Sequence, residues 1–199
     1  MPSFTCADCG TTFELPQPVL DRYPGWTPRQ CRSCRDAGGG GRRQGAPKPP
    51  DTSPTDGVFT DGSADPNPGA GGWGAVWVHD GEVVDERSGG EPDTTNNRME
   101  LRALIEGARM VPEGTPAVLW SDSNLAVQTV NEWAAGWERR GWKRKTGPVQ
   151  NLDLVQEAYR LLQARPELEV RWIKGHAGHE WNEHADRLAN EGRDRHGRA

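Results

Sequence analysis

Four acidic side chains lie where strand ends and helix starts could gather them. Asp61 and Asp122 each follow a short apolar run, and Glu100 and Asp186 fall within stretches of helical periodicity. Strand ends and adjoining helices meet at one edge of an α/β sheet, where carboxylates would repel one another unless cations neutralise them. Such oxygen ligands suit Mg²⁺ or Mn²⁺. Two such ions can support in-line displacement at a phosphodiester, so the pattern predicts a two-metal hydrolytic site.

Taken singly, each carboxylate has a structural alternative. Asp122 precedes Ser123 and could cap the helix that follows it. Glu100 and Asp186 could each be a solvated residue on a helix surface. The prediction of a metal site therefore depends on the four residues together and on the segments that surround them.

The elements that must position these residues follow from hydrophobic periodicity. Alternation from Trp73 to His79 predicts a strand, and the Asp80-Gly81 turn predicts a hairpin with the strand after it. Strands are expected at 58–60, 73–79, 82–88, 117–120 and 168–173, and helices at 97–111, 123–138 (with a possible break at Gly136), 152–163 and 181–193. This β-β-β-α-β-α-α-β-α order predicts an α/β fold, a mixed sheet with helices on its faces.

Composition divides the chain into three regions. Residues 1–35 hold all four cysteines, residues 36–55 are rich in Gly, Pro, Lys and Arg, and residues 56–199 hold nearly all the regular patterning. We expect a small module, a flexible linker and a catalytic domain with one core.

The net charge of −5 offers no general attraction for nucleic acid, so binding must use local basic patches. Neither a membrane-length apolar run nor a secretory signal is found, so we expect a cytoplasmic protein. The sequence does not reveal the oligomeric state, and a monomer is the default expectation.

Five segments in series resemble bacterial ribonuclease HI, a type 1 ribonuclease H. They are Thr60-Asp61-Gly62-Ser63, Thr95-Asn96-Asn97-Arg98-Met99-Glu100-Leu101, Ser121-Asp122-Ser123, Lys174-Gly175-His176-Ala177-Gly178-His179 and Asn182-Glu183-His184-Ala185-Asp186. The match covers residues 56–195 in family order. The resemblance implies the five-stranded ribonuclease H fold. It also implies an endoribonuclease that cuts the RNA strand of RNA–DNA hybrids and leaves 5′-phosphate and 3′-hydroxyl ends.

The same resemblance implies roles for single residues. Asp61 would bridge two Mg²⁺ ions. Asp186 would help to hold the ion that activates the attacking water. Glu100 and Asp122 would help to hold the ion that faces the leaving 3′-oxygen. His176 looks like the family histidine that assists proton transfer or product release, and the alternative is a loop histidine without direct chemistry.

A basic stretch at 139–145 follows two tryptophans and could hold the hybrid. Lys and Arg neutralise phosphates, and Trp faces contact sugars or bases. The stretch resembles the basic protrusion of bacterial family members, and matched positions imply substrate contacts at Thr95, Asn96, Asn124, Trp133, Arg139, Arg140, Lys143 and Asn151. Alternatively, the stretch is a solvated turn with its tryptophans in the core, and Asn96 caps a helix. Asp93 departs from the family, because relatives often carry an Arg there toward the DNA phosphate.

The four cysteines form two knuckles, Cys6-x-x-Cys9 and Cys31-x-x-Cys34, with 21 residues between them. Paired knuckles of this kind give a closed tetrahedral thiolate site, and Gly10 permits the tight turn around the metal. The pattern resembles small bacterial zinc ribbons and predicts one structural Zn²⁺. A redox pair is the alternative, although the βαβ setting of a thioredoxin-like motif is absent from the sequence pattern.

The role of this zinc module is the least determined feature of the sequence. Residues 1–55 carry more Arg and Lys than Asp and Glu, although the whole chain is acidic. We hypothesise an auxiliary grip on nucleic acid that raises the local concentration of substrate. Binding of a protein partner is the alternative.

Two other functions compete with hybrid cleavage at the level of sequence. One is a DNA-cutting resolvase or transposase on the same fold, and the other is a hybrid-binding module without catalysis. The segments around Glu100 and His176 argue against the first. The presence of all four carboxylates argues against the second.

Overall fold

The computed structural model describes residues 2–21, 27–34, 54–144 and 146–196. The chain divides into two compact units, Met1–Thr52 and Ser53–Ala199. In the described part of the smaller unit, β1 (Ser3–Thr5) and β2 (Thr12–Glu14) form an antiparallel hairpin, and α1 (Gln17–Asp21) follows. The rings of Phe4 and Phe13 face each other across this hairpin with centroids 6.0 Å apart.

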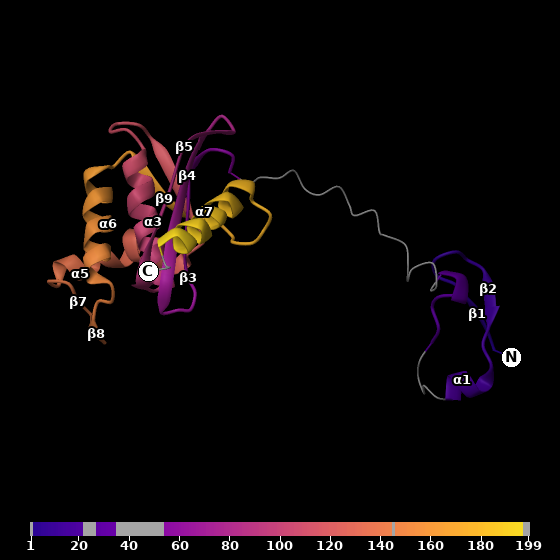
Figure 1. Cartoon of the computed structure of the whole chain (residues 1–199). Coiled ribbons are helices and arrows are strands. Elements are labelled where there is room, and N and C mark those ends of the chain that lie inside the picture. Colours follow the sequence, from indigo (N-terminus) through magenta and orange to yellow (C-terminus); the bar gives the residue numbers. More distant parts are fainter. Residues whose placement is uncertain (1, 22–26, 35–53, 145, 197–199) are drawn as a thin grey trace. The chain divides into compact units, whose positions relative to one another are not determined.

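The larger unit is built on a five-stranded sheet of order β5-β4-β3-β6-β9 (Figure 1). Its strands are β3 (Gly57–Ala64), β4 (Gly69–His79), β5 (Glu82–Thr94), β6 (Ala117–Ser121) and β9 (Leu168–Trp172). The first three are antiparallel neighbours, and β6 and β9 run parallel to β3. This mixed sheet confirms the predicted fold class and the predicted order of the five sheet strands and the main helices.

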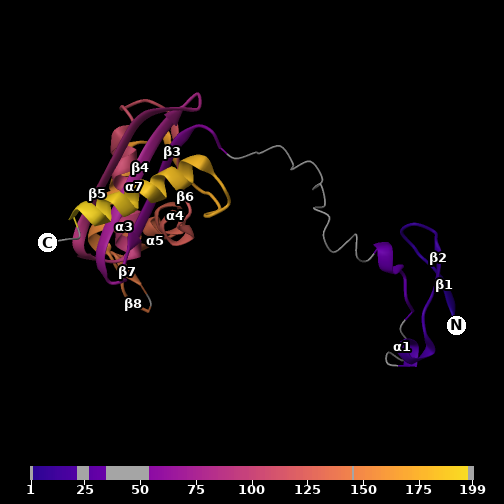
Figure 2. The same cartoon turned by 45° about the vertical axis from the view of Figure 1, so that its right-hand side comes forward.

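Helices cover both faces of the sheet, as two views of the ribbon show (Figures 1 and 2). One face carries α3 (Asn96–Met110), α4 (Asn124–Gln128), η1 (Thr129–Trp133), α5 (Ala134–Arg139) and α6 (Leu152–Ala164), and the other carries α7 (Glu180–His196). The alternation of β3 and β4 separates two cores. Val58 and Ala75 belong to the larger one, under α3, whereas Phe59 and Val76 belong to the smaller one, under α7.

The strand after the Asp80-Gly81 turn is longer than predicted and extends from Glu82 to Thr94. Gly, Pro and Asp are depleted in strands, so residues 89–93 gave no strand signal. The glycines are required by packing. A Cβ at Gly89 would lie 2.8 Å from the Trp73 ring, and one at Gly90 would lie 2.6 Å from Gly192 O.

The predicted helix break at Gly136 is wrong. The backbone instead widens into the π-helical segment η1 at Thr129–Trp133 and then continues as α5 through Gly136 to Arg139. One glycine costs a helix only about 1 kcal/mol, which surrounding packing readily offsets. A small hairpin that the sequence pattern did not indicate, β7 (Lys143–Arg144) with β8 (Gly147–Pro148), lies between α5 and α6. No helix among the described residues is long and apolar enough to cross a membrane.

Candidate active site

The sheet places Asp61 and Asp122 at the same level on neighbouring strands. Parallel pairing of β3 with β6 ends at Thr60 opposite Ser121, so the next residue on each strand carries one of the two carboxylates. Asp61 was expected at the end of its strand, but β3 continues to Ala64 because its antiparallel pairing with β4 extends further. Asp122 lies one residue beyond β6, and the adjacent Ser123 caps α4 by accepting a bond from Ala126 N.

Glu100 reaches these strands because α3 packs unusually close to β3. A Cβ on Gly62 would lie 2.2 Å from both Glu100 N and Met99 C, so only glycine permits this approach. Thr95 is the N-cap of α3 and accepts a hydrogen bond from Arg98 N over 3.4 Å. Glu100 is therefore the fifth residue of the helix, in its second turn and not in the first as expected.

The structure brings three of the predicted carboxylates into one cluster and places the fourth beside it. Asp61, Glu100 and Asp122 each present an oxygen, and these oxygens lie within 4.8 Å of one another. Asp186, on α7, is outside that set but faces Asp61, whose pKa it raises through charge and a hydrogen bond. Asn190 Nδ2 donates to Asp186 Oδ1 over 3.1 Å and holds this carboxylate.

Crowding and burial make the cluster costly to ionise. Burial, then the charges of Asp122 and Asp186, raise the pKa of Asp61 to about 7. Burial, followed by the charges of Asp61 and Asp122, raises the pKa of Glu100 well above its ordinary value. Protein groups alone therefore do not neutralise this site, and a bound cation would.

Two side chains hold Asp122 and a glycine packs against it, and the sequence analysis gave none of these three residues a role. Asn182 Nδ2 donates to Asp122 Oδ2 over 3.2 Å, and Trp172 Nε1 donates to the Asp122 carbonyl oxygen over 3.0 Å. A Cβ on Gly175 would lie 2.3 Å from Asp122 Oδ2. The signal for Asn182 was available, because residues four apart share a helix face and Asn182 precedes Asp186 by four.

The donor set fits hard divalent cations. All four side chains offer carboxylate oxygens, which suit Mg²⁺ or Mn²⁺. Glu100 Oε2 is buried and finds no hydrogen-bond partner in the described part of the chain, and the same is true of Asn182 Oδ1. A buried carboxylate oxygen without a partner is costly unless something else satisfies it. A cation against Glu100 would do so.

His176 lies in the loop between β9 and α7, with its side chain exposed and its backbone in the left-handed region at φ 50°. The preceding Gly175 touches Asp122, so the loop adjoins the carboxylates. The structure thus places His176 near the cluster without a fixed contact that would define its role.

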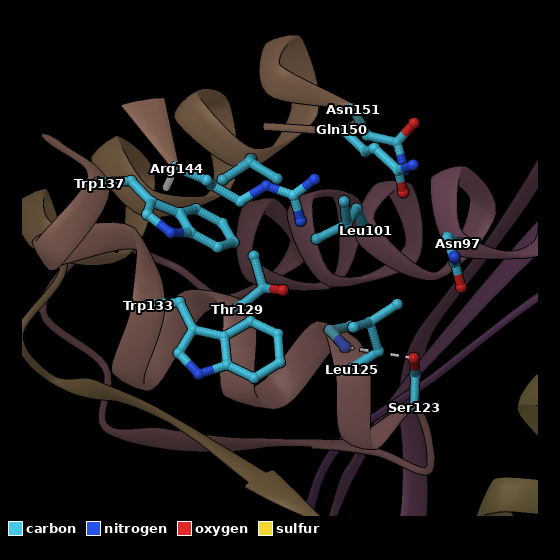
Figure 3. Close-up of a pocket in the computed structure, with 12 residues that line it drawn as sticks. Asn97, Leu101, Ser123, Leu125, Thr129, Trp133, Trp137, Arg144, Gln150 and Asn151 are labelled. Carbon is cyan, nitrogen blue, oxygen red and sulfur yellow. Dashed lines mark hydrogen bonds between the residues drawn. The ribbon is translucent and has the colours of Figure 1, made fainter. Parts of the chain in front are cut away.

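A cavity of about 70 Å³ lies beside α3 and α4, and two of its lining residues, Asn97 and Ser123, are close in sequence to Glu100 and Asp122 (Figure 3). It is lined by Asn97, Leu101, Ser123, Leu125, Ala126, Thr129, Trp133, Trp137, Arg144, Gln150, Asn151 and Val155. Two of the predicted substrate contacts, Trp133 and Asn151, are among these residues. The ring centroids of Trp133 and Trp137 are 5.9 Å apart, so the two indoles form one aromatic wall.

The other predicted substrate contacts lie outside this cavity. The Thr95 hydroxyl caps α3, and Asn96 Oδ1 accepts a hydrogen bond from Ala64 N over 2.5 Å. Asn124 is exposed at the first position of α4. The basic side chains Arg139, Arg140 and Lys143 are exposed and do not line the cavity.

In the smaller unit, the four cysteines form one cluster. The sulfur atoms of Cys6, Cys9, Cys31 and Cys34 lie within 4.8 Å of one another. Gly10 follows the first knuckle at φ 71°, in the left-handed region. Backbone hydrogen bonds, first that of Cys31, lower the pKa of Cys6 to about 6, whereas hydrogen bonds with Cys9 and Cys31 raise the pKa of Cys34. Four thiolates at this spacing fit a tetrahedral metal site.

Comparisons with known proteins agree with this geometry. The RNase H family model matches residues 55–194. Ribonuclease H of Herminiimonas arsenicoxydans is 48% identical over 136 residues, which cover 68% of this chain and 92% of the relative. Ribonuclease HI of Caulobacter vibrioides is 46% identical over 136 residues, covering 68% and 90%. The crystal structure of LC9-RNase H1, a type 1 RNase H, is 35% identical with a TM-score of 0.56, covering 71% of this chain and 74% of that one. The chain therefore belongs to the RNase H family, as a type 1 ribonuclease H, an endoribonuclease that hydrolyses the RNA strand of RNA–DNA hybrids.

Proposed function

We propose that Asp61, Glu100, Asp122 and Asp186 hold two Mg²⁺ ions, for which Mn²⁺ can substitute, and that hydrolysis leaves 5′-phosphate and 3′-hydroxyl ends. The observation that carries this proposal is the set of three carboxylate oxygens within 4.8 Å of one another, beside a fourth carboxylate. Bound there, the two ions would supply positive charge to the attacking and leaving oxygens of an in-line displacement.

The protein's own groups have separate tasks at this site. Gly62 lets Glu100 approach the strands, and Asn182 fixes the direction of the Asp122 carboxylate. We assign to the exposed imidazole of His176 the movement of a proton or the release of product. The contacts of Gly62 and Asn182 place the carboxylates before substrate arrives, which lowers the cost of organising them during the reaction.

Substrate contacts are proposed along the two sides of the carboxylate cluster. Asn96 and Asn124 would face the RNA minor groove, where the 2′-hydroxyl distinguishes RNA from DNA. Thr95, Trp133 and Asn151 would contact the DNA strand. The exposed cations Arg139, Arg140 and Lys143 would add contacts to phosphates whose strength falls as salt rises.

A strand-labelled cleavage assay tests the function. An RNA–DNA hybrid labelled on one strand at a time is incubated with the full chain, with Mg²⁺ or with a chelator, beside duplex DNA of the same sequence. We expect fragments of the RNA strand alone, only with Mg²⁺, and intact DNA throughout. Cleavage of the duplex DNA at a similar rate would support the resolvase-like alternative, and binding of hybrid without cleavage would support a non-catalytic module.

We further propose three regions, a zinc module at 1–35, a linker at 36–55 and the catalytic domain at 56–199. The clustered sulfur atoms support one structural Zn²⁺ in the module. The expected linker, at 36–55, falls almost entirely outside the described residues.

As an auxiliary nucleic-acid grip, residues 1–55 would strengthen hybrid binding, so their deletion should weaken affinity and flatten its dependence on salt. An unchanged affinity and salt slope would favour a protein partner for the module. The monomeric state and the cytoplasmic location stay predictions.

A further inference from the structure

The amide side chain that holds Asp186 is itself held by strand β3. Asn190 Nδ2 donates to the Asp186 carbonyl oxygen over 2.9 Å and to Asp186 Oδ1 over 3.1 Å, so both hydrogens of this nitrogen are in use. At the other end of the amide, Ser63 Oγ donates to Asn190 Oδ1 over 3.5 Å. An amide nitrogen only donates and an amide oxygen only accepts, so a single orientation of Asn190 satisfies all three bonds.

Two glycines of β4 let α7 lie directly on the sheet (Figure 2). A Cβ on Gly74 would lie 2.3 Å from Ala185 O, and one on Gly72 would lie 2.1 Å from Ala189 O. The two helix residues are four apart in the chain, whereas the two glycines are two apart. Four residues of a helix advance about 6 Å and two residues of a strand advance about 6.7 Å, so the two contacts repeat in register.

The same register continues on β3. Asp61 and Ser63 are the partners of these two glycines in the antiparallel pairing of β3 with β4. Residues two apart on a strand point to the same face, so both side chains reach α7. Asp61 meets Asp186, and Ser63 meets Asn190. The contact between two carboxylates is therefore followed, one repeat further along, by a contact between two neutral side chains.

The neutral contact counteracts a repulsion in the charged one. Asp61 and Asp186 carry like charges when both are ionised, so each tends to drive the other away. Asp186 also lies outside the set of three carboxylates whose oxygens are within 4.8 Å of one another, so its place depends on a support of its own. Asn190 supplies that support, and Ser63 ties Asn190 to the strand that carries Asp61.

The amides of α7 support two different carboxylates. Asn182 donates to Asp122, whereas Asn190 donates to Asp186. The spacing 182, 186 and 190 places all three residues of the helix on one face, which is turned toward the cluster. The sequence pattern gave neither Asn190 nor Ser63 a role.

We propose that Asn190 is a positioning residue for Asp186 and that Ser63 is its anchor, so that β3 fixes the fourth carboxylate as well as the first. This assignment rests on the proposed function, because it gives Asp186 a part in holding Mg²⁺.

The test measures Mg²⁺ binding and cleavage separately in variants of the full chain. Asn190→Ala should weaken the binding of Mg²⁺ to the metal-free chain, followed by calorimetry, about 10–100-fold, which is the usual cost of losing such a supporting bond. The Mg²⁺ concentration for half-maximal cleavage should rise by a similar factor. Hybrid affinity in a chelator should stay near that of the natural chain, because the bonds of Asn190 go to the protein and not to the substrate.

Matched variants separate hydrogen bonding from packing. Asn190→Leu keeps a branched side chain of similar size but not the donor, so it should lose as much Mg²⁺ affinity as Asn190→Ala. Asn131→Ala breaks an amide bond to Val170 O, outside the cluster, and should keep the natural affinity. Ser63→Ala should weaken Mg²⁺ binding by a smaller factor, and by nothing further once Asn190 is alanine, because Ser63 acts through Asn190.

Three results would contradict the proposal. A folded Asn190→Ala protein that binds Mg²⁺ as tightly as the natural chain would overturn it. Natural affinity in Asn190→Leu would also overturn it, because the role of Asn190 would then be packing. An equal loss from Ser63→Ala with and without Asn190 would overturn the anchoring by Ser63. If Asn190→Ala does not fold, Asn190→Leu and Ser63→Ala decide, and natural Mg²⁺ affinity in both would overturn the proposal.

The outcomes also separate this proposal from the proposed function. If the natural chain cleaves the RNA strand with Mg²⁺ but Asn190→Ala needs no more Mg²⁺ than the natural chain, only the assignment of Asn190 fails. If the natural chain does not cleave the hybrid at all, the proposed function fails first.

Discussion

Glu100 N lies so close to Gly62 that a Cβ atom on residue 62 would stand 2.2 Å from it. The same Cβ would lie 2.6 Å from Met99 O, so backbone surrounds this position on the helix side. Backbone cannot yield as the end of a flexible side chain can. The distance between strand β3 and helix α3 therefore depends on residue 62 being a glycine, which has no side chain. The reach of Glu100 toward Asp61 depends on it as well.

Gly62→Ala should damage both stability and catalysis. The added methyl must push α3 away from β3, which we expect to lower the free energy of unfolding by about 2 kcal/mol or more. Displacement of Glu100 should also reduce the rate of hybrid cleavage by about 100-fold. Urea unfolding and steady-state cleavage measure the two effects.

Gly136→Ala is the matched control for that variant. Its Cβ would meet only the Arg140 guanidinium, at 3.3 Å, within a helix where alanine is preferred. Stability should hold or rise by about 0.5–1 kcal/mol. If Gly62→Ala proved as harmless as Gly136→Ala, the close packing of α3 on β3 would not be what positions Glu100.

Without divalent metal, Asp61 should make stability fall as pH rises. Its pKa is raised from 3.8 to about 7 in the folded chain, so between those values the folded state retains a proton that the unfolded state has lost. Unfolding then becomes easier with rising pH. Asp61→Asn removes the carboxylate that is costly to ionise in the folded chain. Its free energy of unfolding at pH 8 should exceed that of the natural chain by at most about 4 kcal/mol. Below pH 4 the two proteins should differ little in stability.

Urea unfolding in a chelator across this pH range measures the effect. Asp65→Asn, an exposed substitution in the following turn, should show no such pH-dependent gain. Adding Mg²⁺ should then stabilise the natural chain more than Asp61→Asn, because only the former has its full set of ligands. A metal-free Asp61→Asn protein less stable than the natural chain at pH 8 would contradict the burial and crowding of this carboxylate.

Asn182 should act through Asp122. Asn182→Ala removes the donor that holds Asp122 Oδ2, and loss of such a supporting bond typically costs metal affinity or activity about 10–100-fold. We expect the Mg²⁺ concentration for half-maximal cleavage to rise by that factor, with a smaller change in KM for the hybrid. Asn131→Ala, which breaks a similar bond to Val170 O, should leave the Mg²⁺ requirement unchanged. If Asn182→Ala and Asn131→Ala required the same Mg²⁺ concentration for half-maximal cleavage, Asn182 would not be a positioning residue for Asp122.

The cysteine cluster should hold one Zn²⁺ per chain in protein prepared under reducing conditions. Elemental analysis should give a 1:1 ratio for the natural chain, a much lower ratio for Cys9→Ser, and an unchanged ratio for Ser33→Ala between the second pair of cysteines. Hybrid cleavage by the catalytic domain should survive the loss of zinc. Metal-free protein with a disulfide would favour the redox alternative.

The sheet and the carboxylate cluster could be predicted because their signals are local. Alternation along β4 marks its two faces, and each of the four acids stands in a short recognisable segment. The last part of β5 could not be predicted, because the glycines at 89 and 90 are poor strand formers and are required there by contacts with Trp73 and Gly192.

The residues that line the substrate side of the site could not be predicted, because hydrophobic periodicity does not reveal the contacts that place them there. The π-helical segment at Thr129–Trp133 shifts the phase of the residues that follow, and the β7–β8 hairpin has only two residues in each strand. The basic run at 139–145 therefore could not show that Arg144, and not Arg139 or Arg140, lines the cavity.

The most direct measurement is the initial rate of RNA-strand cleavage by Asp61→Asn, beside the natural chain and Asp65→Asn, at saturating hybrid in Mg²⁺. Asp61 lies at the centre of the cluster, whereas Asp65 is exposed in the turn that follows β3. The rate should fall by at least about 1,000-fold for Asp61→Asn, because ligands that act as a unit fail together. For Asp65→Asn it should stay near the rate of the natural chain. Cleavage by a folded Asp61→Asn protein at the natural rate would show that these carboxylates do not seat the catalytic ions.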